Sequence, residues 1–154
     1  MEIQNEPSRA GTAAPAGEPE YVGFWVRFIA SVIDSILVMA IIYPLMSIMF
    51  GWENLISGNV NPGASLLIEI ILPAVAVIIF WIYRSATPGK MVMGAKIVDA
   101  ATYGKPTTGQ LIGRYFAYYV SMLPLFLGFI WIGFDRRKQG WHDKLAGTVV
   151  IKKE

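Results

Sequence analysis

Two charged residues stand alone in the first long apolar stretch of this 154-residue chain. Arg27 and Asp34 are the only charged side chains between Glu20 and Glu53. Residues 22–50 can cross a bilayer, since about 20 apolar residues span the ~30 Å hydrocarbon core. Arg27 would lie about 7 Å inside such a helix, from where its long stem reaches back to the headgroups. Asp34 would lie about 18 Å inside, near the midplane.

A carboxylate at that depth costs roughly 2.5–3.5 kcal/mol on insertion scales, so Asp34 must face protein or water and have a partner. Seven residues, close to two helical turns, separate it from Arg27, so the two share one face with Ser31 and Ser35. Such a face could exchange a proton or a cation, or it could be a polar seam that joins helices. The residues alone leave both hypotheses open.

A second apolar segment, from about residue 64 to residue 83, supplies another carboxylate. Glu69 lies near its start, about 8 Å from the entry end by helical rise, and Pro73 predicts a kink. Glu69 is either wetted at the interface or a second carboxylate on an ion path. Trp81 and Tyr83, near the far end, are predicted to be interfacial anchors.

The third apolar segment, residues 111–134, contains Pro124 and Gly128. Three simple spans would leave six Lys and Arg residues on each side of the membrane. If the segment enters and returns, all twelve lie on one side and the loop 51–63 carries none, which positive-inside bias favours. Each arm of a folded 24-residue segment is too short to cross alone. We therefore expect a broken or re-entrant hairpin near Pro124, with a plain third span as the alternative.

Two short β-branched pieces, residues 96–99 and 148–151, are too short to persist alone and can pair only on one side of the membrane. The predicted fold is an all-α membrane protein with two transmembrane helices, a third broken or re-entrant hydrophobic segment, and a small cytoplasmic two-strand element. Residues 1–20 are predicted to be a disordered tail, because their composition cannot bury enough surface to fold. Residues 21–154 form the membrane domain.

Composition argues against most kinds of catalysis. The chain has no cysteine and one histidine, His142, so thiol chemistry and a His-rich metal site are excluded within one chain. Gly-x-Ser-x-Gly, Walker and dinucleotide-binding glycine patterns are absent. A net charge of +2 is too small to suggest nucleic-acid binding. We expect no enzyme activity, no cofactor and no bound metal.

These residues together resemble the RDD family of bacterial membrane proteins, which is named for an arginine and two aspartates. Arg27 and Asp34 match the first two, and Asp143, in the ending 139–150, is the candidate for the third. The turn 86–90, the stretch 94–99 and Arg114 are also similar to the family pattern. The resemblance implies a membrane domain involved in transport, with cation/proton exchange in some members.

The candidate ion-handling or structural charge network contains Arg27, Asp34, Glu69, Arg114, His142 and Asp143. The favoured hypothesis is transport of a small ion through an oligomeric polar path, and the alternative is a non-transporting structural or assembly module. We expect a multi-pass protein of the cell membrane with both termini in the cytoplasm. Expected partners are anionic lipid at the basic face and further copies of the chain, which could meet at the small-residue stripe Gly113, Ala117 and Ser121.

Overall fold

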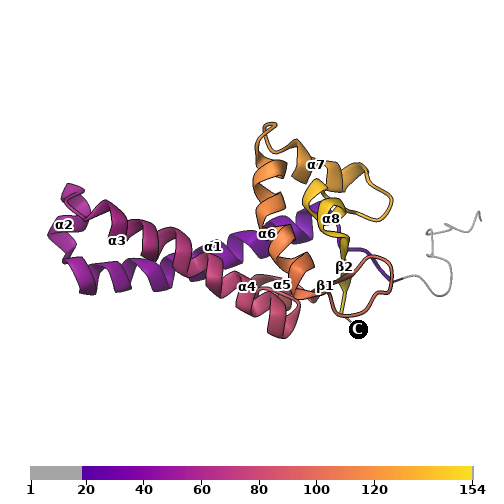
Figure 1. The fold of residues 1–154 in the computed structure, drawn as a ribbon, viewed down its shortest axis with the longest axis horizontal. Coiled ribbons are helices and arrows are strands. Elements are labelled where there is room, and N and C mark those ends of the chain that lie inside the picture. Colours follow the sequence, from indigo (N-terminus) through magenta and orange to yellow (C-terminus); the bar gives the residue numbers. More distant parts are fainter. Residues whose placement is uncertain (1–18, 154) are drawn as a thin grey trace, which may run out of the picture.

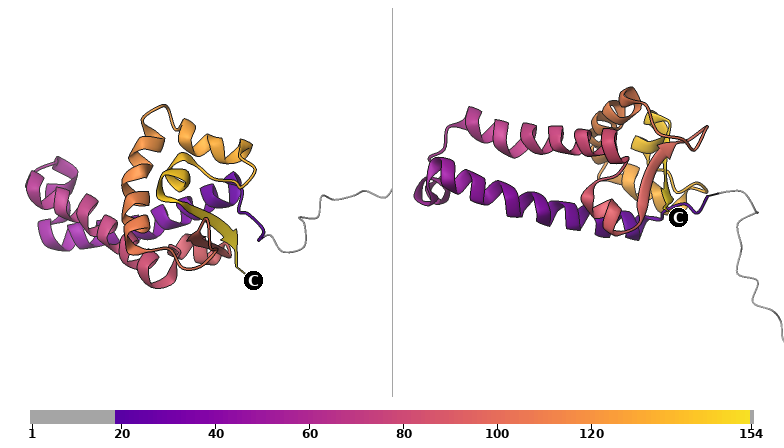
Figure 2. Two further views of the ribbon diagram at one scale, coloured as in Figure 1. Left: turned by 45° about the vertical axis from the view of Figure 1, so that its right-hand side comes forward. Right: turned by 90° about the horizontal axis from the view of Figure 1, so that it is seen from below.

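The computed structural model describes residues 19–153, so nearly all of the predicted disordered tail lies outside the described residues. A long helical hairpin, residues 24–84, projects from a smaller mixed unit, residues 95–153, which we call the cap (Figures 1 and 2). The hairpin consists of α1 (Phe24–Phe50), α2 (Trp52–Ser57), α3 (Pro62–Leu66), the π-helical turn η1 (Leu67–Ile71) and α4 (Leu72–Arg84). A short helix, α5 (Pro88–Val92), leads into the cap. The cap consists of β1 (Ala95–Asp99), α6 (Thr108–Met122), α7 (Leu127–Phe134), α8 (Trp141–Ala146) and β2 (Thr148–Lys152).

Two helical stretches, Phe24–Phe50 and Pro62–Val92, are long and apolar enough to cross a membrane. Their most apolar windows are only 11% buried within the chain, so their apolar side chains are left for lipid. Pro44 lies inside α1 without interrupting it. Pro73 is the second residue of α4 and lies just after η1. Its ring would clash with the carbonyl four residues earlier in a regular α-helix, and the wider π-helical turn relieves that contact.

The third apolar segment is two helices rather than one straight span. α6 and α7 are bent by 100° relative to each other at a break of four residues. Pro124 lies in this break, and Leu125 and Phe126 adopt positive φ angles of 51° and 61°. The predicted break near Pro124 is confirmed. In Figures 1 and 2, α6 runs across the base of the hairpin and α7 turns back over the cap.

The predicted pairing of the two short strands is also confirmed. β1 and β2 are antiparallel, with Ile97 opposite Val150 and Val98 opposite Val149. The amide of Val22 donates to the carbonyl oxygen of Val150 at 3.0 Å. The chain entering α1 is therefore tied to the far edge of β2.

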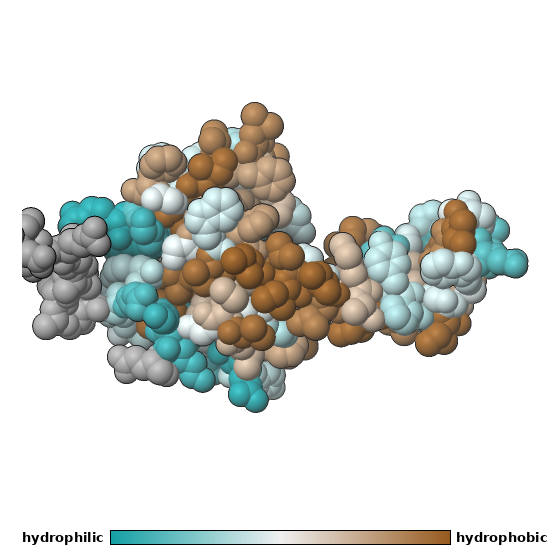
Figure 3. All heavy atoms as spheres, turned by 180° about the vertical axis from the view of Figure 1, so that it is seen from behind, coloured by the Kyte–Doolittle hydropathy of each residue, from teal (hydrophilic) through white to brown (hydrophobic). Residues whose placement is uncertain are grey.

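A hydrophobic core lies where the hairpin meets the cap, formed by Val22, Trp81, Ala95, Ile97, Leu111 and Val150. The prediction that Trp81 is an interfacial anchor is wrong, because its side chain is 1% exposed. Tyr83 is 77% exposed, and its role as an anchor stays a prediction. Apolar residues cover the middle of the face drawn in Figure 3, and the most polar residues gather toward its two ends. This distribution is the one expected of a chain whose middle lies in lipid.

Candidate functional site

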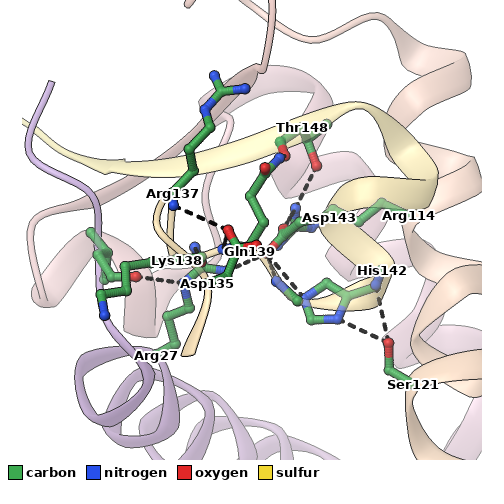
Figure 4. A network of polar contacts seen from close by, with 12 residues as sticks. Arg27, Arg114, Ser121, Asp135, Arg137, Lys138, Gln139, His142, Asp143 and Thr148 are labelled. Atoms are coloured by element: carbon green, nitrogen blue, oxygen red, sulfur yellow. Dashed lines mark hydrogen bonds and ion pairs between the residues drawn. The ribbon is translucent and has the colours of Figure 1, made fainter. Parts of the chain in front are cut away.

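Asp143, on α8, lies at the centre of a buried charge cluster (Figure 4). Its Oδ2 accepts a hydrogen bond from Arg27 Nη1 at 2.5 Å and another from the Gly140 amide at 2.9 Å. Its Oδ1 accepts from Arg114 Nη1. Arg27 comes from α1 and Arg114 from α6. One carboxylate thus joins the membrane hairpin to two helices of the cap.

The two arginines make further contacts that fix their positions. Arg27 donates from Nε to the Val22 carbonyl at 2.9 Å and from Nη2 to the Lys138 carbonyl at 2.6 Å. Arg114 Nη1 also donates to Thr148 Oγ1 at 2.6 Å. Arg27 therefore uses its donors on the cap and on its own N-terminal turn. It makes no hydrogen bond or ion pair with Asp34, although the two residues share one face of α1.

Asp143 is held in its charged form. Burial alone would raise its pKa, but Arg114 and Arg27, together with the Gly140 amide, hold the pKa of this carboxyl well below its usual range. A buried pair of this kind contributes little net stability relative to apolar packing, but removal of one partner leaves an uncompensated charge. Separation of the cap from the hairpin would leave these charges without partners, so the cluster strongly opposes it.

His142 is buried next to Asp143 and packs as an aromatic residue. Its ring centroid lies 4.3 Å from that of Tyr118 and 4.9 Å from that of Phe129. Ser121 Oγ accepts from the His142 amide at 3.1 Å and lies 3.2 Å from Nδ1. Burial, reinforced by the nearby guanidinium groups, lowers the pKa of His142 to about 2. The imidazole is neutral at physiological pH.

Asp34 has different partners, all on the segment that follows the hairpin. Thr87 Oγ1 donates to its Oδ2 at 2.5 Å, and the Gly89 amide donates to its Oδ1 at 2.6 Å. α1 and α5 approach so closely here that a Cβ on Gly89 would lie 2.1 Å from the Ala30 carbonyl oxygen. The half-buried carboxylate of Asp34 therefore clamps α1 to α5 and has the partners that its depth requires.

Of the six residues predicted from the sequence, Arg27, Arg114, His142 and Asp143 form one cluster. Asp34 forms a second, neighbouring clamp. Glu69 is exposed in η1, on the hairpin arm, and its side chain makes no hydrogen bond or ion pair with any of residues 19–153. Residues 19–153 contain no group of three His, Cys, Asp or Glu side chains that could hold a metal ion.

Several residues that complete the site were not singled out as site residues. Thr87 and Gly89 belong to a turn that the family resemblance had marked, and their role as donors to Asp34 could have been suspected from that match. Lys90, in the same turn, is 6% exposed, although lysine is rarely buried without a partner. The hydroxyl oxygen of Tyr118 lies 3.5 Å from Lys90 Nζ. Only the three-dimensional arrangement identifies Lys90 and Tyr118 as part of the site.

Comparison with known proteins gives a consistent result. The family model described as "RDD family" matches residues 21–147. The uncharacterized protein RP437 of Rickettsia prowazekii is 39% identical over 108 residues, covering 66% of this chain and 59% of its own length. This chain therefore spans less than two thirds of that relative.

Two Bacillus subtilis proteins are also similar. The uncharacterized protein YxaI is 32% identical over 150 residues, covering 85% of this chain and 97% of its own length. The uncharacterized membrane protein YteJ is 30% identical over 138 residues, covering 85% of this chain and 80% of its own length. No solved structure matches the chain.

Proposed function

This chain belongs to the RDD family, and from that premise we propose that it is a non-enzymatic module of the cell membrane, whose buried charges lock a cytoplasmic cap onto a transmembrane hairpin. One observation carries the proposal. Arg27, Asp34 and Asp143, which match the residues that name the family, all have polar partners within the chain. Each of these contacts joins segments that are far apart in sequence. The role proposed for the network is therefore assembly.

The cytoplasmic position of the cap is supported by the distribution of charge. Arg27 and every other described Lys and Arg lie on the cap, on α5 or at the end of the hairpin next to the cap. The opposite loop, residues 51–61, has none. Basic residues near membrane-spanning segments are concentrated on the cytoplasmic side. The described C-terminal strand, as part of the cap, would then face the cytoplasm.

The absence of cysteine provides a clean test of this topology. Asn59→Cys lies in the loop opposite the cap, and Ala101→Cys lies in an exposed turn of the cap. In intact cells, a membrane-impermeant maleimide should label the first variant and should leave the second unlabelled until the cells are lysed. The reverse pattern would show that the proposed orientation is wrong.

The assembly role is tested by asking whether the cap loosens when its anchor is removed. Val150, on β2, is 0% exposed, so a Val150→Cys reporter should react slowly with a maleimide in detergent. Adding Asp143→Asn should increase that rate at least tenfold, because the two arginines lose their common charge partner. Lys144→Gln, which removes the pair between the exposed Lys144 side chain and the half-buried Asp135, is the matched control and should leave the rate unchanged. If the reporter at position 150 reacted equally slowly with the maleimide in both variants, the result would contradict the proposal.

A second candidate function, cation/proton exchange, is favoured by one observation. Asp34 is only half buried, and Ser31 and Ser35 beside it are exposed on α1. An oligomer could enclose this face, although the two hydroxyls already donate to carbonyls of their own helix. If Asp34 carries ions, Asp34→Asn should abolish pH-gradient-driven Na⁺ or K⁺ flux in proteoliposomes, and Ser35→Ala should retain it. Absence of flux in the wild type would leave assembly as the sole proposal.

A further inference from the structure

A cavity of about 420 Å³ lies between α1, α6, α7 and α8, next to the charge cluster. Its inner wall is buried and basic, and includes Arg27, Lys90 and Arg114. Its outer wall is apolar and exposed, and includes Phe28, Phe126 and Ile130. Ligand pockets of this size are mainly apolar with a few convergent polar groups. The two walls together fit a molecule with a charged end and an apolar end.

The charges around the inner wall do not balance. With Lys90 protonated, Arg27, Lys90 and Arg114 carry three positive charges, and Asp143 supplies one negative charge. Counting the carboxylate of Asp34, which is bound to Thr87 and Gly89, still leaves one positive charge, and His142 is neutral. A charge buried without a counterion is strongly unfavourable. A protonated Lys90 therefore needs a further negative group in the cavity.

Lys90 is the group that most needs a partner. It is 6% exposed, yet within residues 19–153 its Nζ has only the Tyr118 hydroxyl at 3.5 Å and the face of Trp81, 5.4 Å from the ring centroid. Neither group carries a negative charge. Arg114 Nε is also buried without a hydrogen-bond acceptor among the described residues. Two basic side chains on the cavity wall therefore retain unused donors.

The exposed rim indicates where the ligand comes from. Phe28 is 51% exposed, Phe126 58% and Ile130 45%, and they lie on α1, on the α6–α7 bend and on α7, respectively. Apolar side chains on the outside of a membrane protein face acyl chains, so the mouth of the cavity opens toward lipid. A fully hydrated anion would have to cross this apolar rim, whereas a membrane lipid is already there.

We propose that this cavity binds one anionic phospholipid, with its phosphate at Lys90 and Arg114 and the start of an acyl chain along Phe28, Phe126 and Ile130. Basic pockets between membrane helices are suited to anionic headgroups. The proposal does not depend on transport and goes beyond the assembly role. It predicts a defined site, in contrast to diffuse attraction of lipid to the basic surface.

The test measures binding of short-chain lipids to the purified full-length protein in a neutral detergent by calorimetry. Dihexanoyl phosphatidylglycerol should bind at least tenfold more tightly than dihexanoyl phosphatidylcholine. Inorganic phosphate and hexanoate, which carry the charge without the complete amphiphile, should bind more weakly than phosphatidylglycerol. Equal affinity for the two lipids would overturn the proposal, and so would tighter binding of phosphate or hexanoate than of phosphatidylglycerol.

Two pairs of variants locate the site. Lys90→Gln should weaken phosphatidylglycerol binding by about tenfold or more, as expected for a lost charge-assisted contact. Lys96→Gln removes the same charge from an exposed position on β1 and should change affinity less than twofold. Equal losses in the two variants would indicate surface attraction and overturn the proposal.

If Lys90→Gln fails to fold, substitutions at the apolar rim of the cavity test the proposal instead. Ile130 is half exposed, so Ile130→Trp and Ile130→Val should both fold. The tryptophan should obstruct the mouth and weaken phosphatidylglycerol binding at least fivefold, whereas the valine should not. Unchanged binding to the tryptophan variant would show that the lipid lies elsewhere.

Discussion

Asp143 is the residue on which the junction between hairpin and cap depends most directly. It is fully buried and accepts hydrogen bonds from two arginines and a backbone amide. Asp143→Asn preserves its size but leaves two guanidinium groups without their counterion. We expect it to lower the free energy of unfolding by about 3–5 kcal/mol, the usual effect of breaking a buried pair.

The measurement is denaturation in mixed micelles, followed by circular dichroism. Lys144→Gln is again the matched control, since its pair with Asp135 involves a side chain that is 44% exposed. Exposed pairs contribute about 0–1 kcal/mol. A loss below ~1 kcal/mol for Asp143→Asn would show that the arginines find other partners.

His142 makes the free energy of unfolding depend on pH between about pH 5.5 and 7.5, where Asp143 does not titrate. Its pKa is lowered to about 2 in the folded chain by burial, whereas an unfolded histidine titrates near ~6.5. Between these values the unfolded state binds more protons, so stability falls as pH decreases, by about 1.4 kcal/mol per unit below pH ~6. Denaturation at pH 7.5 and 5.5 should differ by about 1.4 kcal/mol from this group. His142→Gln should remove that difference, and an unchanged difference would assign it to another group.

At the scale of elements, the crossing of α1 and α5 depends on a glycine. Gly89→Ala would place a Cβ 2.1 Å from the Ala30 carbonyl oxygen and 2.9 Å from Asp34 Cγ. α5 would have to move and the Asp34 hydrogen bonds would lengthen. Overpacking of this kind costs about 1–3 kcal/mol, and denaturation in micelles would measure it.

Gly113→Ala is the control for this substitution. Gly113 lies within α6 and has nothing within 4 Å of an added Cβ. Alanine there should be neutral or stabilise by about 0.4–1 kcal/mol. If both variants were equally stable, the α1–α5 contact would be looser than the clamp requires.

The sequence predicted these elements better than it predicted their contacts. Apolar runs specify the two spanning helices, and Pro124 marks the bend, because both signals are local. Arg27 meets Asp143 over 116 residues, and no local pattern encodes such a pairing. The small-residue stripe shows the same limit. Ala117 and Ser121 are buried within the chain, and Ser121 contacts α8 through His142, so neither is free for another copy.

At the scale of the whole molecule, the direction of α6 and α7 relative to the hairpin determines which segments of the chain lie inside the membrane. α6 lies across the base of the hairpin, where α7 and Phe28 share the walls of one cavity (Figure 1). The α6–α7 bend should therefore lie at the depth of the first turns of α1, near the headgroups. Apolar length alone could not distinguish this arrangement from a third span.

Depth-dependent quenching tests the arrangement. Leu125, at the bend, is 85% exposed, and Ile36, further along α1, is 61% exposed. A bimane label on Leu125→Cys should be quenched more strongly by a nitroxide near the headgroup than by one near the end of the acyl chain. The label on Ile36→Cys should show the opposite order, because about 1.5 Å of rise per residue places it near the bilayer centre. Deep quenching at both positions would mean that α6 and α7 penetrate the hydrocarbon core, and the mouth of the proposed lipid site would then lie below the level of any phosphate.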